Sequence, residues 1–207
     1  MDSGRFLKDE AKRLTQENRD LRDELSALRE SVRALSALHV ISQEINAGTN
    51  VLKLLTHILE TSLRVLKASD GSLALMDEET GDLVFAVVRG AAANTLVGYR
   101  LPKGKGIAGW VAENREAQIV HNVRSDPRFF AQVDETFGFQ TRSMACVPVY
   151  LDDGRVLGVI TLLNKVSDRQ FTQDDLDLML IVAQLAATAM RRAERAGIVR
   201  DRLDAIK

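Results

Sequence analysis

Residues 143–164 read SMACVPVYLDDGRVLGVITLLN. Two largely apolar runs, 143–151 and 155–164, flank the triplet Asp152-Asp153-Gly154, whose composition is typical of a tight turn. The stretch therefore predicts an antiparallel β-hairpin. The same pattern occurs upstream, where a predicted turn at residues 79–82 separates two further predicted strands at 72–77 and 83–89.

Helical segments surround the two hairpins. Thr172 is expected to cap a long helix, because acidic residues follow it in the first turns, where the helix dipole favours negative charge. This order of elements predicts an α+β fold built on an antiparallel sheet. The other expected elements are helices at 51–67, 106–114 and 129–137, a strand at 118–123 and a turn at 125–127.

The composition excludes several classes of protein. A net charge of −1 gives no overall field that would attract nucleic acid or an anionic membrane. The single cysteine, Cys146, rules out an internal disulfide and a cysteine-rich metal site. No apolar run reaches the roughly 18–20 residues of a membrane span, and the charged residues 1–10 do not form a secretory signal. We therefore expect a cytoplasmic chain without membrane contact.

A heptad pattern precedes the hairpins. Leucine recurs every seven residues from Leu7 to Leu35, which favours helices that wrap around each other. Asn18 falls at a core position, where an amide is satisfied by pairing across the axis, so the pattern favours a parallel dimer. A single solvated amphipathic helix is the alternative. The residues expected at the dimer seam are Leu14, Asn18, Leu21, Leu25 and Leu28.

The last predicted helix continues beyond the sheet-forming region. A three-four spacing continues from Val182 to Ile206, and every member of the series is apolar except Arg192. Between 172 and 190 the apolar positions are too many for a narrow seam, so we expect this part to pack on its own sheet. For 191–207 we expect a second dimer contact. Two such arms suit a module that relays a conformational state along helices.

Residues 104–109 match the pattern G-x-G-x-x-G. Pro102 precedes them where a dinucleotide fold needs a buried strand, and the other motifs of a kinase are missing, so neither fold is expected. Backbone N–H groups before a helix, with Lys103 and Lys105 beside them, indicate a candidate anion site. A tight turn capped by its own helix is the alternative.

No residues have the local spacing of a catalytic or metal site. The histidines His39, His57 and His121 are far apart in sequence. His121 ends a predicted strand beside Asn122 and is the histidine best placed for a pocket. Cys146 lies in an apolar run and is interpreted as a small buried side chain. We therefore expect no enzyme activity, no metal and no cofactor.

Aromatic residues gather between the two hairpins. Their spacing is compatible with an ordinary core, and equally with the walls of a cavity that stacks a flat ring. The residues are Trp110, Phe129, Phe130, Phe137 and Phe139.

Residues 38–195 resemble a GAF domain, the small-molecule-sensing module of bacterial regulators and cyclic-nucleotide phosphodiesterases. The resemblance implies an antiparallel sheet of five or six strands with helices on both faces. It also implies that the first and last helices share one face and form a parallel dimer, while shorter helices cover a ligand pocket on the other. The matching segments are LPKGKGIAGWV (101–111), NVRSDPRF (122–129), RSMACVPV (142–149) and GVITLLNK (158–165).

One family motif departs from its usual form. Cyclic-nucleotide-binding members carry Asn-Lys, then Phe, then Asp-Glu; Asn164, Lys165, Phe171 and Asp175 match, but Leu176 replaces the Glu. The resemblance implies that Lys165 and Asp175 form a structural ion pair that holds the pocket closed. Bilin attachment and methionine sulfoxide reduction are not expected, because the cysteines that they require are missing. Haem binding through a histidine stays open.

We therefore expect an N-terminal coiled-coil helix at 1–37, a GAF domain at 38–195 and a helical extension at 196–207. The expected function is that of a dimeric sensory module of bacterial-type signal transduction. It would bind a small molecule, with cyclic nucleotides among the candidates, and act on an output domain or partner. A ligand-free dimerisation or protein-interaction module is the alternative. The expected ligand contacts are Arg89, Lys105, Trp110, His121, Asn122, Asp126, Phe130, Phe137 and Met144.

Overall fold

The computed structural model describes residues 10, 12–19, 21, 51–93, 95–166 and 169–195. The chain divides into two compact units, Met1–Leu38 and His39–Lys207. None of the described helices is both long enough and apolar enough to cross a membrane.

The N-terminal unit is helical where it is described. Residues 12–19 form an α-helix, and Leu14 and Leu21 expose 53% and 58% of their surface. Asn18 is exposed on the same helix. Leu25 and Leu28 lie outside the described residues, so the predicted parallel pairing of this helix stays a prediction.

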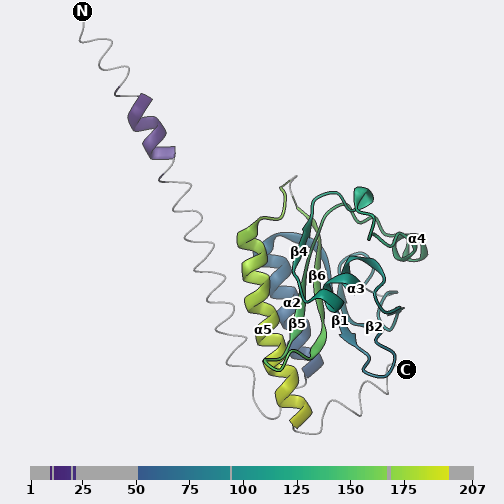
Figure 1. Cartoon of the computed structure of the whole chain (residues 1–207). Helices are drawn as coiled ribbons and strands as arrows, with labels where there is room; N and C mark the ends of the chain where they lie inside the picture. Colours follow the sequence, from purple (N-terminus) through teal and green to yellow (C-terminus); the bar gives the residue numbers. More distant parts are fainter. Residues whose placement is uncertain are drawn as a thin grey trace, which may run out of the picture. The chain divides into compact units, whose positions relative to one another are not determined.

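The second unit is built on one six-stranded antiparallel sheet (Figure 1). The central pair joins the two predicted hairpins, because β1 and β6 lie side by side in the strand order β3-β2-β1-β6-β5-β4. This confirms the predicted α+β class and antiparallel sheet. The strands are β1 (Ala68–Met76), β2 (Leu83–Arg89), β3 (Arg100–Leu101), β4 (Gln118–Val120), β5 (Met144–Tyr150) and β6 (Val156–Lys165).

Two long helices cover one face of the sheet. Helix α2 (Val51–Leu66) packs against β1 and β2, and α5 (Gln173–Arg195) packs against β5 and against α2 (Figure 1). Thr172 caps α5 as predicted: its Oγ1 accepts from the backbone N–H of Asp175 at 3.3 Å. The Asp175 carboxylate accepts in return from the Thr172 N–H at 2.8 Å, which completes a capping box.

The opposite face carries shorter elements. Helix α3 (Gly106–Asn114) packs on β5 and β6, and it is followed by the 3₁₀ turn η1 (Val123–Ser125) and helix α4 (Gln132–Phe137). In Figure 1, α3 and α4 lie on the side of the sheet away from α2 and α5. Helices therefore cover both faces, as predicted.

Four elements differ from the predictions by more than one residue. Strand β4 ends at Val120 rather than at 123, because Val123 already belongs to the 3₁₀ turn η1. Strand β1 begins at Ala68 rather than at 72, because its first residues pair with the end of β6. Strand β3 was not predicted; Pro102 follows directly, which is compatible with a two-residue strand at the sheet edge. Helix α4 begins at Gln132 rather than at 129, because the preceding residues line a cavity in an irregular conformation.

Candidate functional site

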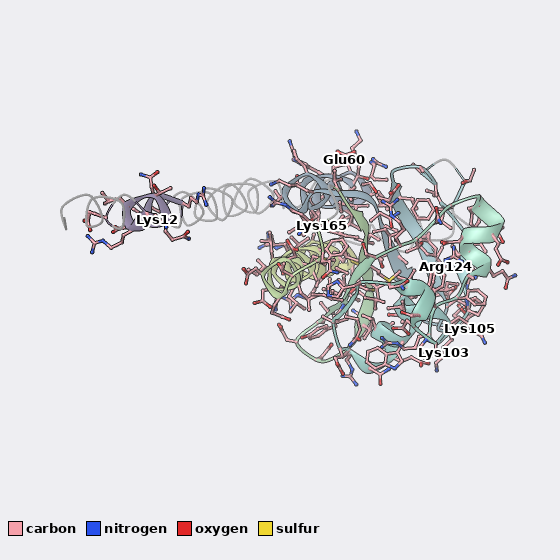
Figure 2. All side chains as sticks on the ribbon, turned by 90° about the horizontal axis from the view of Figure 1, so that it is seen from above. Lys12, Glu60, Lys103, Lys105, Arg124 and Lys165 are labelled. Atoms are coloured by element: carbon pink, nitrogen blue, oxygen red, sulfur yellow. The ribbon has the colours of Figure 1, made fainter. Side chains whose placement is uncertain are left out.

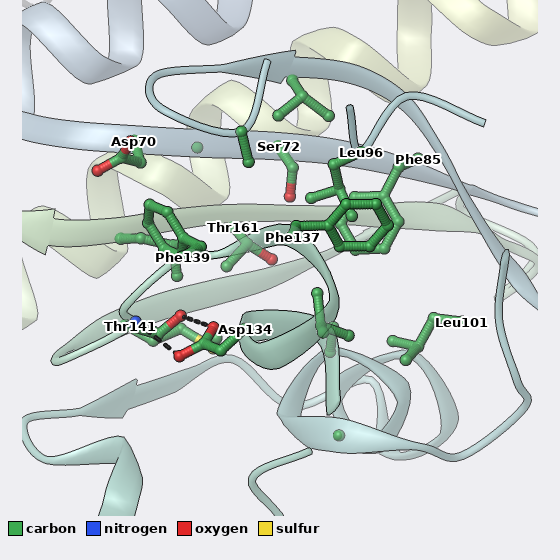
Figure 3. A pocket seen from close by; sticks show the side chains of 18 of the residues that line it. Asp70, Ser72, Phe85, Leu96, Leu101, Asp134, Phe137, Phe139, Thr141 and Thr161 are labelled. Carbon is green, nitrogen blue, oxygen red and sulfur yellow. Dashed lines mark hydrogen bonds between the residues drawn. The ribbon is translucent and has the colours of Figure 1, made fainter. Parts of the chain in front are cut away.

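A cavity of about 90 Å³ lies between the sheet and the shorter elements (Figure 3). Its floor is formed by β1, β2, β5 and β6. Its other walls are formed by Ala92, Leu96 and Leu101, by the start of α3, and by residues 126–141, which we call the cover segment. The floor includes the hydroxyl-bearing residues Ser72 and Thr161, which lie opposite each other on the central strands β1 and β6. Paired residues on neighbouring strands point to the same face, so both side chains face the cavity.

Aromatic side chains make up much of the cavity wall. The ring of Phe137 meets that of Tyr99 edge to face, with 5.2 Å between centroids, and Tyr99 also contacts Phe85 at 6.2 Å. This contact holds the end of α4 against the loop before β3. The phenylalanines that line the cavity are Phe85, Phe129, Phe130, Phe137 and Phe139.

Four of the nine predicted ligand contacts line the cavity. Phe130 and Phe137 come from the cover segment, Met144 from the start of β5 and Arg89 from the end of β2. The guanidinium of Arg89 is engaged at the surface, where its Nε donates to Glu60 at 2.7 Å and its Nη1 to the Val88 carbonyl at 2.9 Å.

The other five predicted contacts lie outside the cavity lining, and each has a local environment of its own. Lys105 precedes α3 and is exposed, and Figure 2 shows it beside Lys103. His121 is exposed, and the Asn122 side chain caps η1 by accepting from the Arg124 N–H at 3.2 Å. The guanidinium of Arg128 lies over the Trp110 ring and forms an ion pair with Asp126.

The glycine-rich loop has a structural explanation. Gly104 and Gly106 have φ angles of +69° and +70°, which favour glycine. A Cβ at Gly109 would lie 2.7 Å from the backbone of Gly104. The loop can therefore approach α3 this closely only because residue 109 has no side chain. The Glu113 carboxylate lies beside Gly104, 3.0 Å from where a Cβ would stand. This geometry matches the tight-turn alternative, and the nearby carboxylate disfavours an anion there.

Arg128 fixes the beginning of the cover segment. Its guanidinium donates to both carboxylate oxygens of Asp126, at 3.0 and 2.7 Å, and lies over the ring of Trp110 at 4.6 Å. A third bond runs to Gln118 Oε1 on β4 at 3.2 Å. The hydrogen bonds from Arg128 hold the pKa of Asp126 below its ordinary value, so this pair stays charged at neutral pH.

Asp134 fixes the end of the cover segment. The carboxylate is buried and accepts from the N–H and the hydroxyl of Thr141, at 2.8 and 2.7 Å (Figure 3). Arg124 adds a third donor at 3.1 Å. The cover segment is therefore held at both ends by charged groups that are fully engaged.

The Asn-Lys motif also acts on the cover segment. Asn164 adopts a left-handed φ of +54°, and its buried amide accepts from the Arg142 N–H and donates to the Gln140 carbonyl, at 2.8 and 2.9 Å. The next residue, Lys165, donates from Nζ to the carboxylate of Asp175. The motif thus joins the end of the cover segment to β6 and to the first turn of α5.

Ser72 and Thr161 were missed as candidate site residues. Each has an apolar or small residue directly before and directly after it in its strand, which is the signal that could have identified them. Their register opposite each other, and the closure of the cover segment over them, depend on long-range pairing that no local pattern encodes.

Cys146 lies beside this row of hydroxyls but is chemically quiet. Its side chain is fully buried, and burial raises the pKa of the thiol from 9.0 to about 12. Its sulfur lies 3.3 Å from Thr161 Oγ1. Across the described residues, no cluster of three or more His, Cys, Asp or Glu side chains could hold a metal ion.

The family model of the GAF domain matches residues 50–190, which is more than half of the chain. The chain belongs to the GAF domain family. The matched region contains all six strands, both layers of helices and the cavity. The GAF domain is a signalling and sensory module found in phosphodiesterases and in bacterial signalling proteins.

Curated relatives match this GAF domain over a small part of their own length. The chain is 33% identical over 96 residues to "Dual 3′,5′-cyclic-AMP and -GMP phosphodiesterase 11A" from Takifugu rubripes, covering 46% of the chain and 11% of the relative. It is 30% identical over 146 residues to "Probable 3′,5′-cyclic phosphodiesterase pde-5" from Caenorhabditis elegans, covering 66% of the chain and 20% of the relative.

Solved structures share the fold at low sequence identity. The GAF domain of a phosphoenolpyruvate-protein phosphotransferase from Coxiella burnetii superposes with a TM-score of 0.72 at 22% identity, covering 81% of this chain and 98% of that one. A free methionine-R-sulfoxide reductase from Neisseria meningitidis superposes with a TM-score of 0.65 at 20% identity, covering 79% of this chain and 91% of that one. The same fold is thus found in an enzyme and in part of a larger protein.

Proposed function

We propose that this GAF domain is a sensory module that binds a small molecule in the cavity beneath the cover segment. The observation that supports the proposal is an apolar and aromatic cavity under a segment held by polar contacts at both ends. Small-molecule sites are concave and mostly apolar, with a few placed polar groups. The proposed role is regulatory, and burial of the single cysteine, which raises its thiol pKa to about 12, disfavours catalysis through a cysteine thiolate.

Two contacts provide a route from the cavity to α5. Asn164 and Lys165 connect the end of the cover segment to the start of α5. At the far end of α5, Glu194 accepts from Arg155 at 2.6 Å, and Arg155 also donates to Glu78 at 2.7 Å, which ties both hairpin turns to this helix. A ligand that favours one arrangement of the cover segment would shift the population of α5 positions by its differential affinity.

We also propose that the chain forms a parallel homodimer, in which the relay would act on paired helices. Leu14 and Leu21 are exposed at heptad spacing in the N-terminal unit. On α5, Ile181 exposes 48% of its surface and lies between the half-buried Leu178 and Leu185 at a spacing of three and four. These apolar stripes on the first and last helices are the surfaces that a second copy would cover. An output domain or partner would receive the signal.

A matched pair of variants tests the sensory proposal. Ala108 lines the cavity from α3, so the larger side chain of Ala108→Leu would fill part of the cavity, and leucine has a good helix propensity. Ala117→Leu makes the same change at a position outside the lining. We expect the low-molecular-weight fraction of a cell extract to raise the thermal midpoint of the wild type and of Ala117→Leu, but not of Ala108→Leu. An extract that stabilises none of the three, at fixed protein concentration, would contradict the proposal.

Cyclic nucleotides are the first class to test, because the names of the curated relatives refer to them. At 100 times the dissociation constant, binding would stabilise the fold by ~2.7 kcal/mol, a shift on the order of 5–10 °C at this chain length. A shift of this size with cyclic AMP or cyclic GMP would assign the ligand. Leu176, which replaces the Glu of the family motif and is buried, lowers the expectation for this class.

The second candidate is a ligand-free dimerisation or protein-interaction module. The observation that favours it is the cavity volume of about 90 Å³, well below the roughly 300 Å³ at which drug-sized ligand sites begin. The aromatic rings of the cover segment would then serve as core. In this case Ala108→Leu would stabilise the protein and no small molecule would do so.

A further inference from the structure

One buried hydroxyl in the cavity floor lacks a hydrogen bond. Ser72 is buried, with 5% of the residue's surface exposed, and its Oγ bonds to no other residue in the described part of the chain. Figure 3 shows the Ser72 and Thr161 side chains reaching from the floor toward Phe137. Buried hydroxyls are nearly always satisfied by protein or water, so an unsatisfied one that faces a cavity indicates the position of a bound polar group.

The residue opposite Ser72 also has a hydroxyl with unused hydrogen-bonding capacity. Thr161 lies opposite Ser72 on β6, and among the described residues its hydroxyl meets only the sulfur of Cys146, a weak partner, at 3.3 Å. Two adjacent hydroxyls with spare donors and acceptors form a polar spot within a wall of aromatic and aliphatic side chains. A ligand that matches it needs an apolar body and one group that can both donate and accept.

The charges around the cavity select against anions. Asp70 and Asp134 contribute carboxylates to the lining, and both are occupied by N–H or O–H donors, including the Ala91 N–H at 2.8 Å from Asp70. Arg89, the cation among the described lining residues, is bound to Glu60. No described lining residue therefore offers an uncommitted positive charge to a phosphate or carboxylate group.

The size of the cavity limits the ligand further. An engineered protein cavity of about 150 Å³ binds benzene, and the present cavity is about 90 Å³. One aromatic ring therefore requires a small outward movement of the half-buried Phe137 or Phe139, whereas a nucleotide requires displacement of the whole cover segment. Aromatic walls suit a flat ring, which packs offset or edge to face against them.

We infer that the cavity takes a small neutral ligand of about one aromatic ring that bears a hydroxyl group, anchored on Ser72. The inference rests on the proposed sensory function of the same cavity. Thr161 flanks the anchor, and the phenylalanines of the cover segment close over the ring. The chemical class is that of phenol.

The test compares three probes of similar shape on the full chain. Phenol carries the hydroxyl, toluene replaces it with a methyl group, and benzoate adds a negative charge. Affinities are measured by titrating amide NMR spectra of the wild type, of Ser72→Ala and of Ser69→Ala. Ser69 is the control on the same strand, because its hydroxyl is engaged by Asp70 and by the Asn164 carbonyl outside the cavity.

We expect phenol to bind the wild type more tightly than toluene does, and benzoate to bind least. Ser72→Ala should weaken phenol binding several-fold, up to about tenfold, and leave toluene binding unchanged, since one hydrogen bond is lost. Ser69→Ala should change neither affinity. A Ser72→Ala variant with the wild-type spectrum outside the cavity shows that the fold is intact.

The contrary outcomes separate the two proposals. Equal affinities for phenol and toluene, or equal losses in Ser72→Ala, would overturn the anchor and leave the sensory site standing. Tighter binding of benzoate or of cyclic AMP would overturn the neutral selectivity, again without touching the sensory function. Failure of every probe, together with an extract that stabilises nothing, would overturn both.

Discussion

At the scale of single residues, Ser72 gives the sharpest prediction. Because its buried hydroxyl has no partner among the described residues, Ser72→Ala removes a desolvated polar group without breaking a hydrogen bond. The ligand-free protein should therefore keep its stability or gain up to about 1 kcal/mol. Ser69→Ala, which removes an engaged hydroxyl, should lower it. Urea unfolding measures both, and a loss above about 1 kcal/mol in Ser72→Ala would mean that the hydroxyl is satisfied.

Cys146 supplies a prediction about pH. Burial raises its thiol pKa from 9.0 to about 12, so between these values the unfolded chain releases a proton that the folded chain retains. The thiol's contribution to stability is complete below pH 9 and is lost as the pH rises toward 12. We expect the wild type to lose more stability than Cys146→Ala over this range.

The burial of Cys146 also predicts its reactivity. We expect no alkylation by iodoacetamide at pH 8 in native protein, and full alkylation in urea; rapid native alkylation would contradict the buried placement.

At the scale of elements, the cover segment depends on Asp134. Asp134→Ala would leave the buried N–H and hydroxyl of Thr141 without their acceptor and would release Arg124, at a cost of about 2–3 kcal/mol. Glu135→Ala removes an exposed carboxylate from the same helix and serves as the control. Limited proteolysis should cut the Asp134→Ala variant within residues 126–141 well before the control. Equal cutting of both variants would show that Asp134 does not hold the segment.

The elements also show how far sequence patterns reach. Both hairpins, α3 and the cap of α5 follow from local alternation, turn residues and capping, and the structure confirms them. Strand β3 has two residues, too few for a periodic signal, and exists through its pairing with β2. Of the four expected ligand contacts that line the cavity, Phe130 and Phe137 belong to the cover segment, whose aromatic residues carry a hydrophobic signal in the sequence. The floor residues Ser72 and Thr161 are brought together by the pairing of β1 with β6, two strands that are far apart in the sequence.

At the scale of the whole molecule, a single substitution can test the proposed dimer. Leu21 is exposed at a seam position of the heptad, so Leu21→Glu places a charge where two helices would meet. We expect at least a tenfold weaker dimer by sedimentation equilibrium. Gln16→Glu adds the same charge at the heptad position farthest from the seam and should leave the association unchanged. A monomeric wild type, or equal association of all three proteins, would contradict the parallel dimer.

The most direct test of a small molecule in the cavity is the mass of the full chain under native conditions, as purified from cells and again after denaturation. We expect a stoichiometric excess mass on the wild type and on Ala117→Leu, and none on the cavity-filling Ala108→Leu. The excess mass should be released on denaturation and correspond to a neutral compound of about one aromatic ring. An excess mass that Ala108→Leu retains, or native masses equal to the bare chain for the wild type both before and after incubation with phenol, would contradict it.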